Sequence, residues 1–184
     1  FEPEVESVIH KHTDVAEVAV IGVADKLRGE VPKAFIVVKE GKYLITRRSK
    51  TKKRFPGMWT VPGGKLEAGD YLKLPKDTEH YWYNVLERTL RREVKEEVGI
   101  EIDNIDYLTS LATVHTDGSP SLVISCIADY KSSDVILQPD ELDEYTWVTL
   151  EEAKNYDLID GIYDELKMAE DKRKGTKINE WKRA

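Results

Sequence analysis

The sequence REVKEEVG at residues 92–99 decides the fold, because it puts three carboxylates on one side of a predicted helix. Glu93, Glu96 and Glu97 are spaced i, i+3 and i+4, and side chains at these spacings lie about 5–6 Å apart on a helix surface. Like charges in this arrangement cost a helix roughly 0.2–0.5 kcal/mol per pair. A divalent cation between the carboxylates would remove that cost, since such ions prefer oxygen ligands. The stretch therefore predicts a metal-binding face on a helix.

An apolar stripe runs beside the acidic face of the same helix. It consists of four residues at intervals of four: Leu86, Leu90, Val94 and Val98. Such a stripe predicts packing against a sheet, and Gly99 directly after it predicts a left-handed cap at which the helix ends. The charges alone also fit a second interpretation, a solvated helix face on which the glutamates pair with Lys95 and Arg91.

A glycine-rich turn upstream favours the metal-binding interpretation. The sequence VPGGKLEAGD at residues 61–70, taken with residues 92–100, resembles the signature of the Nudix hydrolases. That signature is a glycine, five residues, a glutamate, seven residues and then Arg-Glu-aliphatic-x-Glu-Glu-x-Gly-aliphatic. Here Asp70 stands at the first glutamate position, and 21 residues separate it from Arg92. The difference is a 14-residue insertion at about residues 71–84, and an insertion in a loop need not disturb the helix.

The resemblance covers about residues 33–170 and implies both a fold and a reaction. The fold is of the α/β (α+β) class, a mixed sheet sandwiched between helices, with the glycine-rich turn and a helix over residues 79–98 building the site. Asp77 or Thr78 is the expected cap of that helix. The reaction is the Mg²⁺- or Mn²⁺-dependent hydrolysis of a diphosphate bond in a nucleoside triphosphate, an oxidised nucleotide or a dinucleotide. The alternative is a Nudix-fold module that binds a nucleotide without cleaving it.

The resemblance also implies roles for residues of the signature. The metal ligands would be Glu93, Glu96 and Glu97 together with a backbone carbonyl at Gly63 or Gly64. Arg92 would fix the Glu93 side chain by a charged hydrogen bond.

One glutamate would take the proton of the attacking water. It is either a glutamate of the signature or Glu141, which lies in the acidic loop before the Trp147 strand, with Glu144 as the rival. A plain solvated acidic loop is the other interpretation of that segment.

A basic segment, RRSKTKKR at residues 47–54, contains six basic residues in eight. Such a run is typical of a solvated loop and can also mark a nucleic-acid patch. In an acidic protein we prefer a third role, in which Arg47 and Arg48, together with Lys65, bind substrate phosphates that the metal does not reach.

Further elements follow from apolar patterns. Strands are expected over Ile105–His115 and Ser121–Tyr130, and helices over Leu150–Ala153 and Leu158–Arg173. In the insertion, the consecutive residues 81–83 (Tyr-Trp-Tyr) are expected to place one or two rings against the sheet, with base stacking by Trp82 or Tyr81 as the alternative.

The first 38 residues predict a short α/β unit with a helix at residues 3–12 and strands at Val15–Val23 and Lys33–Val38. Their amino-acid sequence resembles a fragment of the C-terminal subdomain of adenylate-forming acyl-CoA synthetases, without the segment that carries that family's catalytic lysine. We therefore expect an appendage at residues 1–32 and a Nudix domain at residues 33–184. An acyl-CoA or a synthetase partner bound by residues 1–38 is a weaker possibility.

Composition limits the partners. The net charge of −7 argues against a stable nucleic-acid complex. The resemblance to the Nudix hydrolases implies a small nucleotide as substrate. No apolar run approaches the roughly 20 residues of a membrane span. The single cysteine, Cys126, is expected to be buried and unpaired, which fits a cytoplasmic protein. The oligomeric state stays open, and a homodimer is one expectation because many relatives are dimers.

Overall fold

The computed structural model of the protein describes residues 32–116 and 118–176. The predicted appendage at residues 1–32, with its strand Val15–Val23 and its likeness to acyl-CoA synthetases, lies almost entirely outside these residues. In the described ranges, no helix is both long and apolar enough to cross a membrane.

Within the residues that the structure describes, seven strands form one mixed sheet. They are β1 (Pro32–Lys39), β2 (Lys42–Arg48), β3 (Trp59–Thr60), β4 (Gly63–Lys65), β5 (Glu101–Val114), β6 (Pro120–Ser132) and β7 (Leu142–Val148). The main path runs β3-β2-β1-β6-β5, with β4 paired to β1 and β7 paired to β2. The β1–β6 pair is parallel and the other pairs are antiparallel. The mixed sheet is as predicted.

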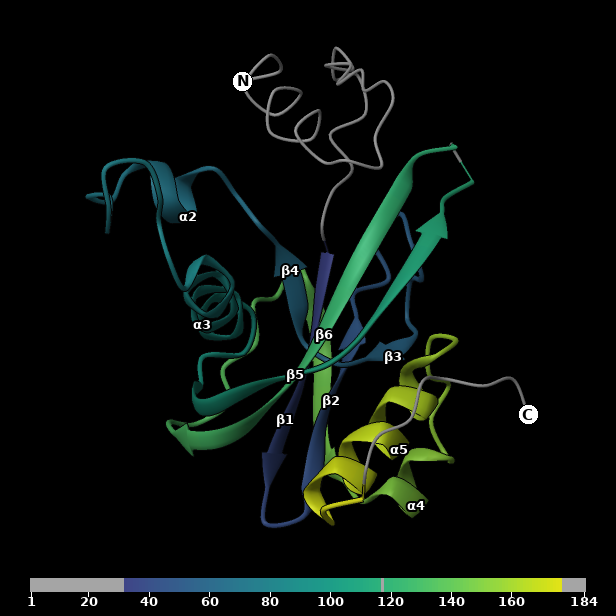
Figure 1. Cartoon of the computed structure of the whole chain (residues 1–184). Helices are drawn as coiled ribbons and strands as arrows, with labels where there is room; N and C mark the ends of the chain where they lie inside the picture. Colours follow the sequence, from purple (N-terminus) through teal and green to yellow (C-terminus); the bar gives the residue numbers. More distant parts are fainter. Residues whose placement is uncertain (1–31, 117, 177–184) are drawn as a thin grey trace, which may run out of the picture.

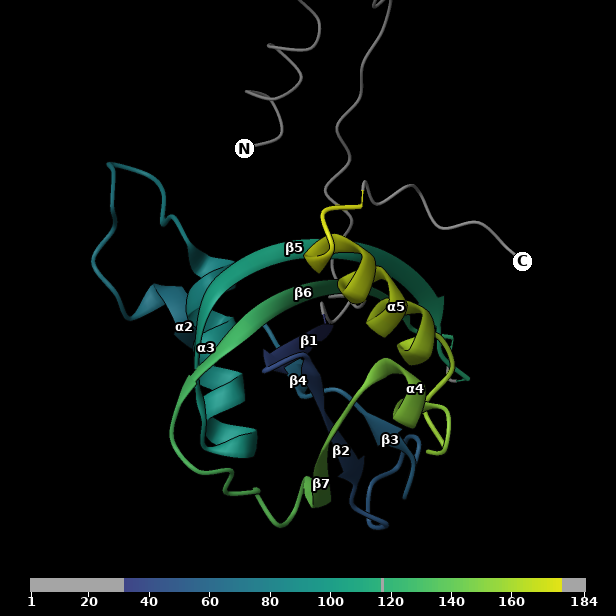
Figure 2. The same cartoon turned by 90° about the horizontal axis from the view of Figure 1, so that it is seen from below.

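Helices cover both faces of this sheet. They are α2 (Gly69–Leu72), α3 (Val85–Val98), α4 (Leu150–Ala153) and α5 (Ile162–Arg173). Figures 1 and 2 show α3 on one face and α4 and α5 on the other. The expected sandwich of a mixed sheet between helices is confirmed.

The alternation of apolar residues in β1 explains the two layers. Phe35 and Val37 point to the α3 face and pack with the helix stripe, whereas Ile36 and Val38 join the core under α5. Because successive side chains of a strand point to opposite faces, one continuous apolar strand serves both cores. The predicted stripe is confirmed, as is the buried position of Cys126.

Two predicted helix starts are wrong. α3 begins at Val85 rather than at residue 79, because the proposed caps have other partners. Asp77 accepts a hydrogen bond from the Tyr83 N–H at 2.8 Å, and Thr78 accepts one from the Tyr81 N–H at 3.0 Å. α5 begins at Ile162 rather than at residue 158, after Gly161 in the left-handed region.

The aromatic residues of the insertion pack on the insertion itself rather than on the sheet. The Trp82 ring meets the Tyr71 ring edge-on, with centroids 5.5 Å apart, and its Nε1–H donates to the Leu74 carbonyl at 3.0 Å. Tyr81 and Tyr83 are exposed. The insertion therefore forms a small lobe that projects beside α3 (Figures 1 and 2).

The end of α3 provides a test of stability. Gly99 caps the helix with φ 74°, and a Cβ there would lie 3.1 Å from the backbone nitrogen of Ile136. Gly41, in the β1–β2 turn, has a similar φ of 79° but open space around it. A left-handed conformation costs a non-glycine residue about 1–2 kcal/mol. We expect Gly41→Ala to lose about that free energy of unfolding and Gly99→Ala to lose more, as measured by urea denaturation. Equal losses would show that the Ile136 contact does not constrain α3.

Candidate active site

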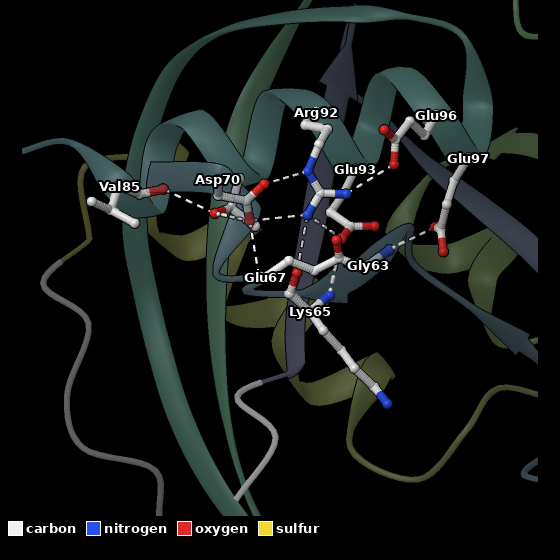
Figure 3. Close-up of polar contacts among 10 residues, drawn as sticks. Gly63, Lys65, Glu67, Asp70, Val85, Arg92, Glu93, Glu96 and Glu97 are labelled. Carbon is white, nitrogen blue, oxygen red and sulfur yellow. Dashed lines mark hydrogen bonds and ion pairs between the residues drawn. The ribbon is translucent and has the colours of Figure 1, made fainter. Parts of the chain in front are cut away.

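The Arg92 guanidinium is the centre of a cluster of carboxylates (Figure 3). It pairs with Asp70 on α2, with Glu93 at 2.8 Å and with Glu96 at 2.8 Å. It also donates to the Lys65 carbonyl at 3.2 Å. A planar group with five N–H donors can satisfy several acceptors at once. The expected contact between Arg92 and Glu93 is present, and the shared contacts with Asp70 and Lys65 are additional.

Asp70 is a bidentate partner of Arg92. Its Oδ1 lies 2.5 Å from Nε and its Oδ2 lies 3.0 Å from a terminal nitrogen. Burial favours the neutral acid, but hydrogen bonds from Arg92, the Glu67 N–H and Thr89 outweigh it and lower the pKa of Asp70 to about 2. Asp70 is therefore ionised at any physiological pH.

Glu93 lies against the glycine-rich strand β4. Its Oε1 accepts from the Lys65 N–H at 3.1 Å. A Cβ at Gly64 would lie 1.9 Å from the Glu93 carboxyl carbon, so a side chain there would displace the Glu93 carboxylate. Burial raises the pKa of Glu93, and the nearby charge of Glu96 adds to this, although Arg92 and the Lys65 N–H oppose it.

Glu97 lies one helical turn further along α3, on the same strand. Its Oε2 accepts from the Gly63 N–H at 3.0 Å. The protein atoms around its carboxyl group raise the pKa of Glu97 to about 7, despite the Gly63 hydrogen bond. The charges of Glu93 and Glu141 also raise it, and that of Arg48 lowers it.

Arg91 and Lys95, two positive residues of α3, do not pair with the three glutamates. Arg91 donates to the Ile102 carbonyl and pairs with Asp103, while Lys95 donates to the Gly99 carbonyl. Both side chains therefore form their bonds where α3 ends and β5 begins. This arrangement argues against a plain solvated face on which they pair with the three glutamates.

The donor chemistry fits a hard divalent cation. Two partly buried carboxylates, Glu93 and Glu97, stand one turn apart, and the charge of one disfavours ionisation of the other. A cation between them would relieve this repulsion. Glu96 is more exposed than either and, like Glu93, is paired with Arg92. In the described part of the chain, no three His, Cys, Asp or Glu side chains are already arranged to share an ion.

The loops near Glu97 contribute charges of both signs. Glu141 forms an ion pair with Lys52, and its charge, like that of Arg48, acts on the Glu97 carboxyl group. The rival residue, Glu144, pairs with Arg47 at 2.7 Å. Of the two acidic-loop candidates, Glu141 is thus the one whose charge acts on the signature glutamates.

The predicted phosphate-binding residues are not all brought together. Arg47 is held by Asp143 and Glu144, each at 2.7 Å, and Arg48 donates to the Arg54 carbonyl at 3.0 Å. The Lys65 side chain extends away from the Arg92 cluster (Figure 3). The backbone of Lys65, rather than its side chain, contacts that cluster.

Sequence reasoning missed one residue of the cluster. Thr89 is fully buried and donates from its hydroxyl to Asp70 at 2.8 Å. Threonine in a helix carries no functional signal by itself, so only the position of Asp70 in space reveals it.

Comparison with known proteins places this arrangement in a family. The sequence profile of the NUDIX domain matches residues 29–168. The nucleoside triphosphatase NudI of Klebsiella pneumoniae is 28% identical over 139 residues, which cover 67% of this chain and 84% of that protein. The NAD-capped RNA hydrolase NudC of Pseudomonas aeruginosa is 29% identical over 121 residues, which cover 65% of this chain but 36% of that protein.

Solved structures share the fold. A MutT NUDIX hydrolase from Burkholderia pseudomallei superposes with a TM-score of 0.61 at 21% identity and covers 77% of this chain and 98% of its own. The NUDIX domain of Shewanella oneidensis NrtR, solved with ADP ribose, has a TM-score of 0.59 at 16% identity and covers 91% of this chain and 97% of its own. Hydrolases of this family generally use a divalent metal. The match over most of the chain, the fold and the signature residues together show that this protein belongs to the NUDIX domain family.

Proposed function

We propose that the protein is a pyrophosphohydrolase that uses Mg²⁺ or Mn²⁺ to cleave a diphosphate bond in a nucleotide substrate. The observation that carries this proposal is the pair of carboxylates, Glu93 and Glu97, held against strand β4 by the N–H groups of Lys65 and Gly63. Relatives that act on nucleoside triphosphates and NAD-capped RNA support a nucleotide substrate.

In this proposal, different residues bind the metal and accept the proton of the attacking water. Glu93, Glu97 and a backbone carbonyl of Gly63 or Gly64 would hold the metal, and Glu96 would join them on leaving Arg92. A bound metal would neutralise diphosphate oxygens and lower the pKa of the attacking water. Glu141 accepts the proton of that water, because its charge already acts on the Glu97 side of the site.

The basic segment would bind the phosphates. Arg48 acts on the Glu97 carboxyl group and is the better placed of the two arginines. Arg47 would have to leave Asp143 and Glu144 to reach a substrate. The Lys65 side chain would have to turn toward the Arg92 cluster to do the same.

A nucleotide-binding module without hydrolysis is the second candidate. One observation favours it: Glu96 is paired with Arg92 rather than turned toward Glu93 and Glu97. The two functions differ in whether a metal produces turnover or only strengthens binding.

The function is tested with a substrate panel. Nucleoside triphosphates, ADP-ribose, NADH, dinucleoside polyphosphates and coenzyme A would be assayed for cleavage with and without Mg²⁺ or Mn²⁺. We expect metal-dependent turnover that Glu97→Gln lowers by on the order of 100-fold or more, because it removes a charged ligand of the metal that stabilises the transition state. Glu87→Gln, the same change in the first turn of α3, is the matched control and should keep full activity.

Each result has a clear meaning. Turnover that is lost in Glu97→Gln but kept in Glu87→Gln supports the hydrolase and identifies its substrate. Binding of a nucleotide without cleavage of any compound would replace the hydrolase by the binding module.

The raised pKa of Glu97 predicts a pH dependence of stability in the metal-free protein. The Glu97 carboxyl group has a pKa near 4.5 in the unfolded chain and near 7 in the folded protein, so folding favours its protonated form. Its contribution to the free energy of unfolding is therefore fully present below pH 4.5 and is lost as the pH rises through 7. As the pH rises between these values, the wild type loses this stability and Glu97→Gln does not. We therefore expect the free energy of unfolding of Glu97→Gln to increase relative to that of the wild type by on the order of 1–3 kcal/mol. Urea denaturation in the presence of EDTA measures it. A pH-independent difference between the two proteins would contradict the assignment.

The N-terminal segment is proposed to be an appendage without a catalytic part. Deletion of residues 1–28, which precede the family match, should leave turnover and substrate preference unchanged. A deletion variant that folds but loses activity, or a full chain that binds coenzyme A through this segment alone, would instead support a working site there. A cytoplasmic location and the oligomeric state are proposals of the same kind, which fractionation and sedimentation would test.

A further inference from the structure

Asp70 is one methylene shorter than the glutamate of the family signature, yet both of its oxygens reach Arg92. A short side chain has little reach, so the position of its backbone and the orientation of its carboxylate decide whether both oxygens meet the guanidinium. Two groups hold them. The Glu67 N–H donates to Oδ2 at 3.0 Å, and the Thr89 hydroxyl donates to the same oxygen at 2.8 Å.

Thr89 is well suited to this task. Its side chain is completely buried, and it lies three residues before Arg92, on the same side of α3. Its hydroxyl is within reach of the Asp70 carboxylate and, at 3.0 Å, of the Val85 carbonyl. A hydroxyl has a single proton, and an ionised carboxylate is the stronger acceptor. The proton therefore belongs to the bond with Asp70.

The hydrogen bond between Thr89 and Asp70 also joins the two ends of the insertion. Asp70 precedes residues 71–84 and Thr89 follows them, so the bond joins the two ends of the added segment. Asp77 and Arg88 add a weaker contact at 3.5 Å within the same lobe. Without the Thr89 bond, the start of the insertion would depend on Arg92 and the Glu67 turn.

We propose that Thr89 is a positioning residue for the metal-binding glutamates and that it acts through Asp70 and Arg92. This inference rests on the proposed function. Arg92 is shared between Asp70, Glu93 and Glu96. Asp70 takes the Nε–H and one terminal nitrogen of Arg92, which limits how closely the guanidinium holds Glu93 and Glu96. When Asp70 is loosened, Arg92 binds these two glutamates more tightly and competes with the cation.

The test measures binding of Mn²⁺ alone, by calorimetry and by the paramagnetic signal of the free ion. Thr89→Val keeps the shape and removes the hydroxyl, whereas Thr89→Ser keeps the hydroxyl. Thr46→Val is the matched control, since Thr46 is equally buried and its hydroxyl lies 3.5 Å from the Thr60 carbonyl, outside the cluster. We expect Thr89→Val to weaken Mn²⁺ binding about tenfold and Thr89→Ser and Thr46→Val to leave it within about twofold.

A double-mutant cycle tests the route. If Thr89 acts through Asp70, adding Thr89→Val to Asp70→Asn weakens Mn²⁺ binding no further than Asp70→Asn alone. Independent, additive losses would overturn the route, and an equal loss in Thr89→Ser would overturn the role of the hydroxyl. Should Thr89→Val fail to fold by circular dichroism, Thr89→Ala carries the same comparison.

The two proposals fail in different ways. A wild-type protein that binds no Mn²⁺ overturns the metal-dependent function. A wild-type protein that binds Mn²⁺, beside a folded Thr89→Val variant that binds it equally well, overturns only the role of Thr89.

Discussion

The close approach of strand β4 to helix α3 is the constraint on which the site depends. A side chain at Gly64 would collide with the Glu93 carboxyl group, so backbone forms one wall of the site. The N–H groups of Gly63 and Lys65 face the carboxylates of Glu97 and Glu93 from that wall. The apolar stripe of α3 and the cap at its end keep the helix at this distance from the sheet.

The second feature is that the surroundings of two carboxylates in the site shift their pKa values in opposite directions. Hydrogen bonds and Arg92 keep Asp70 ionised, with a pKa near 2, whereas burial brings that of Glu97 to about 7. One acid is thus a permanent partner of the arginine, and the other gains most from an added cation. Groups whose environments drive their pKa values apart are those that take different roles in a site.

Local periodicity in the sequence predicted the helices and strands. Contacts between segments that are distant in the sequence could not be predicted from it. The stripe of α3, its Gly99 cap and the strand at Lys33–Val38 depend on neighbours in the chain and were predicted correctly. The start of α3 was placed too early, because Asp77 and Thr78 bond within the insertion. The pairing of Arg47 with Asp143 follows from the β2–β7 ladder, which no local pattern of the sequence specifies.

The insertion shows why spacing along the chain is a poor guide to spacing in the site. What α3 requires is a carboxylate against Arg92, and Asp70 supplies it although 21 residues lie between them. The added residues satisfy one another, with Trp82 packed on Tyr71 and Asp77 bonded to Tyr83. Because the lobe is closed on itself, it adds surface beside α3, while the bonds between α3 and β4 are made by residues outside the insertion.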